Sequence, residues 1–152
     1  MHYLFDTNVI SHSRRPERTN DHFRRFMAAI EPEDFCVSVV TILEIEFGIL
    51  RQERRDANFA RLLREWLEAL VLPLLGNRIL NVTLPIARRC ATLPTPNCVP
   101  TPNCVPTNDA LIAATALELK LAVVTRNIGD FERFGVEIID PWQADRSDPR
   151  PR

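Results

Sequence analysis

The sequence predicts an α/β fold in which a central, mostly parallel sheet lies between two layers of helices, a three-layer α/β/α sandwich. Three observations lead to this prediction. Five short apolar runs have the length of buried strands, five longer segments carry apolar residues at helical spacing, and the two kinds of segment alternate along the 152-residue chain. Parallel strands need helical crossovers, and these cover both faces of the sheet.

The predicted strands are mostly continuous in apolar residues, as expected for strands buried on both faces. In order they are residues 2–6 (HYLFD), 35–40 (FCVSVV), 78–82 (RILNV), 121–125 (LAVVT) and 136–140 (VEIID). The predicted helices are residues 21–30, 42–53, 57–72, 84–91 and 109–119. A short helix is also expected directly after Asp6, because Asp, Thr and Asn are good N-cap residues.

Length and composition favour one globular domain, because 45% of the residues are hydrophobic and can form a sizeable core. We expect this domain to span residues 1–142 and the polar, proline-rich segment 143–152 to form a flexible tail. The hexapeptide Pro-Thr-Pro-Asn-Cys-Val occurs twice in tandem between Pro94 and Val105. Its proline density predicts a long loop before the last predicted helix.

Composition also limits the functional classes. No apolar run approaches the roughly 20 residues that span a bilayer, and the first residues do not resemble a signal peptide, so we expect a cytoplasmic protein without membrane contact. The net charge of -1 provides no global basic field for nucleic acid. Of the 19 basic residues only Lys120 is a lysine. Guanidinium groups suit phosphate recognition, although a GC-rich genome gives the same bias.

The four cysteines and three histidines do not form a predicted zinc site, because no Cys-x2-Cys pair or Cys/His cluster has zinc spacing. Cys36 lies in an apolar strand and is expected in the core. A disulfide between Cys98 and Cys104 is an alternative that a cytosolic location disfavours.

Four acidic residues follow predicted strands or begin predicted helices. Asp6 and Glu44 come after the first and second strands, Asp109 falls in the first turn of a helix, and Asp130 follows the fourth strand. Each has an ordinary explanation. Asp6 is a good N-cap, Glu44 closes the capping box Thr41–Glu44, a helix dipole favours Asp109, and Asp130 suits a turn.

Taken together, the four acids predict a metal site. Ligands of parallel sheets bind outside the carboxyl ends of the strands, and carboxylates gathered there repel one another unless a cation lies among them. Oxygen ligands without nearby His or Cys favour Mg²⁺, with Mn²⁺ as a possible substitute. Such an ion activates water and neutralises charge on a phosphodiester, so the pattern points to a nuclease.

Four motifs, in their order and spacing, resemble the PIN-domain ribonucleases, and most closely the VapC-type toxins of bacterial type II toxin-antitoxin modules in their FitB-like branch. The motifs are LFDTNVIS (4–11), SVVTILEIEFGI (38–49), TNDALIAATAL (107–117) and VVTRNIGDFERFGVEIIDPW (123–142). The resemblance covers nearly the whole chain to Trp142. It implies a PIN-like α/β/α fold and a Mg²⁺-dependent endoribonuclease that hydrolyses RNA phosphodiester bonds.

The resemblance also implies which residues form the catalytic and metal-binding pocket. Asp6 and Asp109 match the most consistent metal ligands of the family, and Glu44 and a fourth acid complete the pocket. We assign the fourth position to Asp130, although some relatives carry the acid directly after the Thr-Arg pair, where this chain has Asn127. The residues expected to support these ligands are Thr7, Asn8, Thr125 and Asn127.

Several partners are implied by the same resemblance. They are an RNA substrate, a second copy in a homodimer, and a small VapB-like or FitA-like antitoxin that brings a basic side chain to the pocket and binds operator DNA for the complex. An apolar stripe along residues 57–75 fits either an exposed interface or packing on the sheet. Arg14 and Arg15 are candidates for RNA phosphate contacts, with a solvated helix end as the alternative.

Other functions stay open at this point. Haloacid-dehalogenase-like phosphatases also place an aspartate after the first strand, but they need a second aspartate where this chain has Asn8, and a lysine for which only Lys120, in a helix, is available. A PIN-like module that binds RNA or a partner without cleavage is a second alternative. A non-toxin PIN nuclease in RNA processing is a third.

Overall fold

The computed structural model describes residues 1–94 and 106–143. The predicted hexapeptide loop, with Cys98 and Cys104, lies outside the described residues except for Pro94, and so does the predicted tail except for Gln143. The proposed domain boundary therefore stays a prediction. The strands are β1 (Tyr3–Phe5), β2 (Phe35–Ser38), β3 (Ile79–Leu80), β4 (Ala122–Val124) and β5 (Ile138–Ile139).

The helices outnumber the strands and include several short ones. The α-helices are α1 (Thr7–Ser13), α2 (Asp21–Ala29), α3 (Val39–Glu53), α4 (Ala57–Trp66), α5 (Leu72–Leu75), α6 (Leu84–Cys90), α7 (Asn108–Leu119) and α8 (Ile128–Phe131). The single turns of other helix types are η1 (Pro16–Arg18), η2 (Pro32–Asp34), the π-helical η3 (Leu67–Val71), η4 (Gly76–Arg78) and η5 (Glu132–Phe134).

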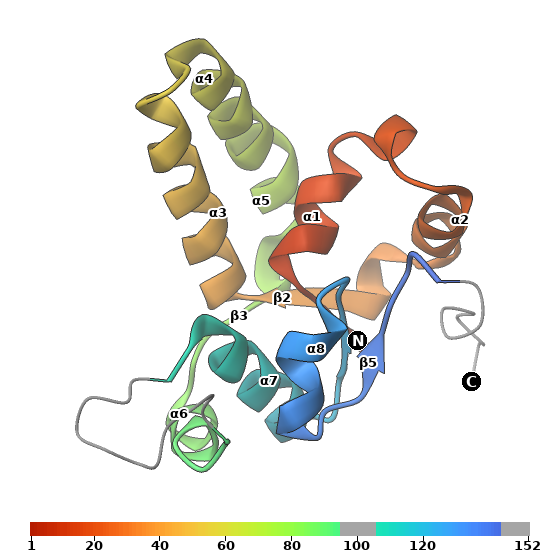
Figure 1. The fold of residues 1–152 in the computed structure, drawn as a ribbon, viewed down its shortest axis with the longest axis vertical. Helices are drawn as coiled ribbons and strands as arrows, with labels where there is room; N and C mark the ends of the chain where they lie inside the picture. The colour runs from red at the N-terminus through yellow and green to blue at the C-terminus, as the bar shows by residue number, and fades with distance from the viewer. Residues whose placement is uncertain (95–105, 144–152) are drawn as a thin grey trace.

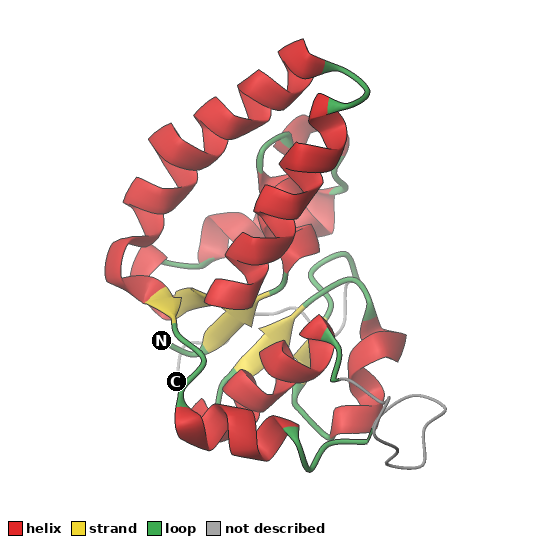
Figure 2. Cartoon of the chain, turned by 90° about the vertical axis from the view of Figure 1, so that its left-hand side faces the viewer, coloured by secondary structure: helices red, strands yellow, loops and turns green. Residues whose placement is uncertain are grey.

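All five strands run parallel in one sheet, in the order β3-β2-β1-β4-β5. Leu4 in the central strand pairs with Cys36 of β2 and Val123 of β4. Because the chain adds strands on both sides of β1, its crossover helices lie on both faces of the sheet (Figure 2). The predicted fold class is confirmed, and each strand is shorter than predicted.

Successive strand residues enter two different hydrophobic cores. Leu4 of β1 packs in the core beneath α6, α7 and α8, whereas its neighbour Phe5 packs in the core beneath α1 to α5. Val123 and Val124 of β4 divide in the same way. This alternation is the pleat of a strand whose two faces are both covered, and it explains the continuous apolar runs in the sequence.

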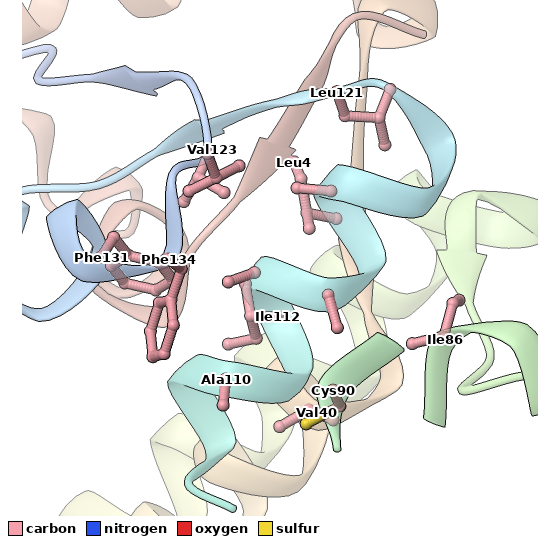
Figure 3. Packing of buried hydrophobic residues seen from close by; sticks show 14 of the residues in the cluster. Leu4, Val40, Ile86, Cys90, Ala110, Ile112, Leu121, Val123, Phe131 and Phe134 are labelled. Atoms are coloured by element: carbon pink, nitrogen blue, oxygen red, sulfur yellow. The ribbon is translucent and has the colours of Figure 1, made fainter. Parts of the chain in front are cut away.

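The core on the α7 side fixes that helix firmly to the sheet. Ile112 of α7 shares a packed cluster with Leu4 and Phe131 (Figure 3). Four α7 residues with small side chains are buried and allow close approach to the neighbouring elements; they are Ala110, Ala113, Ala114 and Ala116. The start of α7, where Asp109 lies, is therefore held by a rigid support.

The opposite core is aromatic and also binds the end of the described chain. The rings of Phe5 and Phe35 stack with their centroids 4.4 Å apart. After β5, Trp142 returns to α2, where its ring lies 4.4 Å from that of Phe23 and its carbonyl accepts a hydrogen bond from Asn20 Nδ2 at 3.0 Å. Contacts of the fold therefore extend to Trp142.

Helices α3 and α4 form an antiparallel hairpin that projects from the sheet (Figure 1). Arg64 of α4 binds Glu46 and Glu53 of α3 at 3.3 and 2.7 Å. The single helix predicted for residues 57–72 is wrong in one respect, because the π-helical η3 interrupts it before α5. Pro73 lacks the N–H that would bond the carbonyl four residues earlier, and the widened turn is a common response to that loss.

Some residues of the predicted apolar stripe along residues 57–75 are buried and others are exposed. Leu67 and Val71 are buried against the sheet, whereas Leu62 and Leu70 are exposed. Cys36 is buried as predicted, and burial raises the pKa of its thiol to about 11, as for a core residue. Among the described residues, no helix is long and apolar enough to cross a membrane.

Candidate functional site

The carboxyl ends of the parallel strands bring the predicted acids to one edge of the sheet. Asp6 directly follows β1, and Ser38, the last residue of β2, is the N-cap of α3. Figure 1 shows α1 and α3 leaving the sheet on the same side. Helices that begin at this edge point their positive dipole ends toward it, which favours carboxylates there.

Asp6 is held in one orientation by three hydrogen bonds. Its Oδ1 accepts from the Thr7 backbone N–H at 2.7 Å, and its Oδ2 accepts from Asn8 Nδ2 and Thr125 Oγ1, each at 2.7 Å. The residue is only 3% exposed. Burial raises the pKa of Asp6, the hydrogen bonds from Thr125, Thr7 and Asn8 oppose that rise, and the charge of Glu44 adds to it. Asp6 is therefore both the predicted N-cap of α1 and an immobilised carboxylate.

Glu44 reaches the same edge from the second turn of α3, where Thr7 Oγ1 donates a hydrogen bond to its Oε2. The capping box predicted at Thr41–Glu44 is wrong, because α3 begins at Val39 and Ser38 accepts from the Val40 N–H at 3.2 Å. The strand ends two residues earlier than predicted, so the serine takes the capping role. Glu44 is consequently free of capping and available to the site.

Asp109 lies in the first turn of α7, as predicted, with Thr107 as the N-cap that accepts from the Ala110 N–H at 3.2 Å. The pKa of Asp109 is raised from 3.8 to about 6. Burial is the largest cause, followed by the negative charges of Asp6, Asp130 and Glu44, while Arg133 opposes the rise. The four predicted acids thus act on one another electrostatically.

The acid predicted for the fourth position, Asp130, is exposed. Asp130 lies in the short helix α8, where a turn was predicted, and its charge raises the pKa of Asp109. The Asn127 backbone N–H donates to Thr125 Oγ1 at 3.0 Å, so this residue supports the threonine that orients Asp6. Asn8 also bridges the site, because its Oδ1 accepts from the Arg126 backbone N–H at 3.2 Å.

The side chains suit a hard divalent cation that retains part of its water shell. Within residues 1–94 and 106–143, no three His, Cys, Asp or Glu side chains are gathered tightly enough to hold a metal ion by themselves. Both oxygens of Asp6 are hydrogen-bonded, and mutual repulsion keeps like charges apart. Mg²⁺ commonly binds through one or two carboxylates plus water and substrate phosphate, so an open, all-oxygen site of this kind fits it.

The PIN domain family matches residues 3–137, a span that contains all four acids. The chain belongs to the PIN-domain family. It is 36% identical to the plasmid stability protein StbB of Pseudomonas syringae pv. tomato, over 93% of this chain and 99% of that protein. It is 32% identical to the VapC ribonuclease Y4jK of Sinorhizobium fredii, over 92% and 97% of the two chains.

A toxin from another organism and a solved structure agree with this assignment. Toxin FitB of Neisseria gonorrhoeae is 33% identical over 91% of this chain and 97% of its own. The crystal structure of FitAcB from the same organism matches this PIN domain with a TM-score of 0.77 and 29% identity, covering 93% of this chain and 99% of that one. The predicted family, with toxin and ribonuclease relatives, is confirmed, and divalent-metal dependence is general among PIN nucleases.

The phosphatase alternative does not fit this geometry. Lys120 is the C-cap of α7 in a left-handed conformation, with φ 57°, and it precedes β4. In a parallel sheet this position lies at the edge opposite to Asp6. The only lysine in the chain is therefore remote from the acids.

Sequence reasoning missed Ser38 and Arg133. The capping role of Ser38 was not predicted because Thr41 is an equally good N-cap residue. Arg133 supplies the positive charge that opposes the raised pKa of Asp109, and its three-residue spacing from Asp130 was the available signal. Arg14 of the predicted phosphate-binding pair stacks over the Phe59 ring at 5.3 Å, which supports a packing role beside α4.

Proposed function

We propose that this PIN domain is a metal-dependent endoribonuclease and the toxin of a type II toxin-antitoxin module. The observation that carries the proposal is the meeting of Asp6, Glu44, Asp109 and Asp130, from four separate elements, at the carboxyl edge of the sheet. Mg²⁺, with Mn²⁺ as its substitute, is the proposed cofactor because every side chain offered is an oxygen ligand.

Each acid has a distinct proposed role. Asp6 is the fixed anion, because three hydrogen bonds and burial prevent it from turning away. Asp109 and Glu44 complete the negative field that attracts the cation, and the Thr7 hydroxyl holds Glu44 in place. Asp130 is exposed, and we assign it the role of orienting a water molecule for attack on the phosphodiester.

A bound Mg²⁺ would neutralise charge on the phosphodiester and lower the pKa of a bound water. The protein contributes rigidity, since α7 is packed against the sheet and the side chain of Asp6 is locked. It also contributes a local charge that the overall net charge of -1 does not reveal. Substrate specificity then depends on surfaces beside the acids.

A cleavage assay with metal titration tests this proposal. The wild type should cleave single-stranded RNA only when Mg²⁺ or Mn²⁺ is present, and Asp6→Asn should lose most of that activity because the amide keeps the shape without the charge. Asp34→Asn is the matched control, because Asp34 precedes β2 at the opposite edge and, within the described residues, its side chain bonds only His2, at 3.2 Å. Equal cleavage by all three proteins would end the nuclease proposal, as would RNA binding without cleavage.

The proposed partners are a FitA-like or VapB-like antitoxin and a second copy of this chain. The related structures FitAcB and FitAB, the second bound to a DNA fragment, support a protein partner for this fold. The dimer proposal rests on exposed apolar residues that follow one face of α3; they are Val39, Leu43, Phe47 and Leu50. Operator DNA would be bound through the antitoxin, and a cytoplasmic location follows from an RNA substrate.

A further inference from the structure

The outer surface of α3 carries a polar row that begins at the acidic site and leads away from it. Glu44, Gly48 and Arg51 are spaced by four and three residues, so they lie on one face of the helix. Arg55, in the turn after the helix, continues this row. A cavity of about 150 Å³ is lined by Gly48, Arg51, Gln52 and Arg55. The apolar residues proposed for the dimer lie on a neighbouring face.

Gly48 has no explanation in the internal packing of the protein. It lies inside the longest helix, where glycine is less favourable than alanine. A Cβ atom placed at Gly48 would meet nothing within 4 Å. The absence of a side chain is therefore not required by any neighbour in the described part of the chain, and its effect is to leave the cavity open to an outside molecule.

The two arginines beside Gly48 are available for binding. Neither Arg51 nor Arg55 forms an ion pair or a side-chain hydrogen bond within residues 1–94 and 106–143, and both are exposed. Arg64 on the same hairpin is different, because Glu46 and Glu53 already neutralise it. A basic residue in the last turn also stabilises a helix through its dipole, but that effect does not explain the adjacent glycine or the cavity.

We propose that the row Gly48, Arg51 and Arg55 is the path along which single-stranded RNA leaves the acidic site, with the arginines binding phosphates that flank the scissile bond. Arg51 is seven residues from Glu44, so their backbones are about 10 Å apart along the helix. That separation places the contact at a neighbouring phosphate. Guanidinium groups bind phosphate oxygens in a planar fork, and Gly48 lets the sugar-phosphate backbone approach the helix closely.

The charges along this row fit single-stranded RNA. Acids at one end repel the RNA backbone, so an anionic strand needs a positive contact nearby to remain bound, with or without a cation at the acids. Arg51 and Arg55 provide that contact on the same face as Glu44. The proposal rests on the proposed nuclease function for its substrate class, although the RNA contact itself is measurable without cleavage.

The test measures binding of a labelled, mixed-sequence single-stranded RNA to the full chain in EDTA, where cleavage is not expected, at a series of salt concentrations. Arg51→Gln combined with Arg55→Gln should weaken binding about fivefold to tenfold at low salt. It should also reduce the slope of log affinity against log salt by about 1.4, because two phosphate contacts are lost. Gly48→Met, which covers the cavity, should weaken binding while raising the melting temperature.

The matched control is Arg54→Gln combined with Arg88→Gln, which removes the same charge. Arg54 ends α3 outside the row, and Arg88 lies on α6, across the sheet. If the control weakens RNA binding as much as the Arg51 and Arg55 pair, the contact is non-specific electrostatics and the proposal is overturned. If the pair leaves RNA binding unchanged but abolishes capture of a co-expressed antitoxin, the row is a protein interface and the proposal is also overturned.

Cleavage separates this inference from the proposed function. With Mg²⁺ present, the paired variant should cleave long RNA more slowly than the wild type, yet cleave a dinucleotide at the same rate, because a dinucleotide has no flanking phosphate. Row-dependent RNA binding without any cleavage would support the path and refute the nuclease. Normal cleavage of long RNA by the paired variant would refute the path and leave the nuclease intact.

Discussion

Replacing Asp109 with asparagine should stabilise the metal-free protein at neutral pH. The pKa of Asp109 is raised from 3.8 to about 6, first by burial and then by the charges of Asp6, Asp130 and Glu44. The native state therefore binds more protons than the unfolded chain between about pH 4 and about pH 6, and stability falls as pH rises through this window. At pH 7 the ionised carboxylate carries the full penalty.

The magnitude follows from the same values. A pKa rise from 3.8 to about 6 corresponds to about 3 kcal/mol of unfolding free energy. Because Asp109 is only half-buried, solvent screening reduces this to about 2 kcal/mol. The asparagine also loses the favourable interaction with the dipole of α7, about 0.3–1 kcal/mol. We expect Asp109→Asn to be about 1 kcal/mol more stable than the wild type at pH 7.

Urea unfolding in EDTA at about pH 7 and about pH 4 measures this difference. The gain should vanish at the lower pH, where the wild-type carboxyl is protonated. Addition of Mg²⁺ should stabilise the wild type more than Asp109→Asn. A variant that is less stable than the wild type at pH 7, or equally altered at both pH values, would refute the electrostatic coupling of the four acids.

Three further predictions concern the support of the site, the core and the dimer. Thr125→Val removes the hydroxyl that donates to Asp6 Oδ2. It should lower the unfolding free energy measured in urea by about 1–3 kcal/mol and reduce RNA cleavage, and unchanged stability and activity would contradict the orienting role of Thr125. Leu67→Ala should lower the unfolding free energy by about 2–5 kcal/mol because Leu67 is fully buried. Leu70 is 63% exposed, so Leu70→Ala should change the unfolding free energy little, and equal losses in the two variants would contradict this difference in burial. Phe47→Asp should yield a monomer in light scattering if the exposed face of α3 forms the dimer, and an unchanged mass would remove that surface from consideration.

The positions of the strands could be predicted because each is covered on both faces, which leaves a continuous apolar run in the sequence. The convergence of Asp6 and Glu44 followed from parallel topology, since residues after parallel strands share one edge. The start of α3 could not be predicted, because Ser38 and Thr41 are both good caps and only the end of β2 decides between them. The π-helical turn before Pro73 likewise depends on how the helix adjusts to a missing N–H.

The electrostatic state of the site was also beyond sequence reasoning. The raised pKa of Asp109 depends on its burial and on the charges around it, and Arg133 enters the balance only after α8 and η5 have folded. The hydrogen bonds that Thr125 makes with Asp6 and Asn8 join residues far apart in the chain. Residue types and topology thus predict which acids meet, while packing decides how they are held.

A crystal structure of the wild-type chain with Mn²⁺, using the anomalous signal of the ion, tests the central claim most directly. The account predicts an anomalous peak between Asp6 and Asp109, with carboxylate oxygens of both residues coordinating the ion and with Glu44 and Asp130 beside it, directly or through water. No peak at this edge under saturating Mn²⁺, or an Asp109 side chain that points away from Asp6, would contradict it.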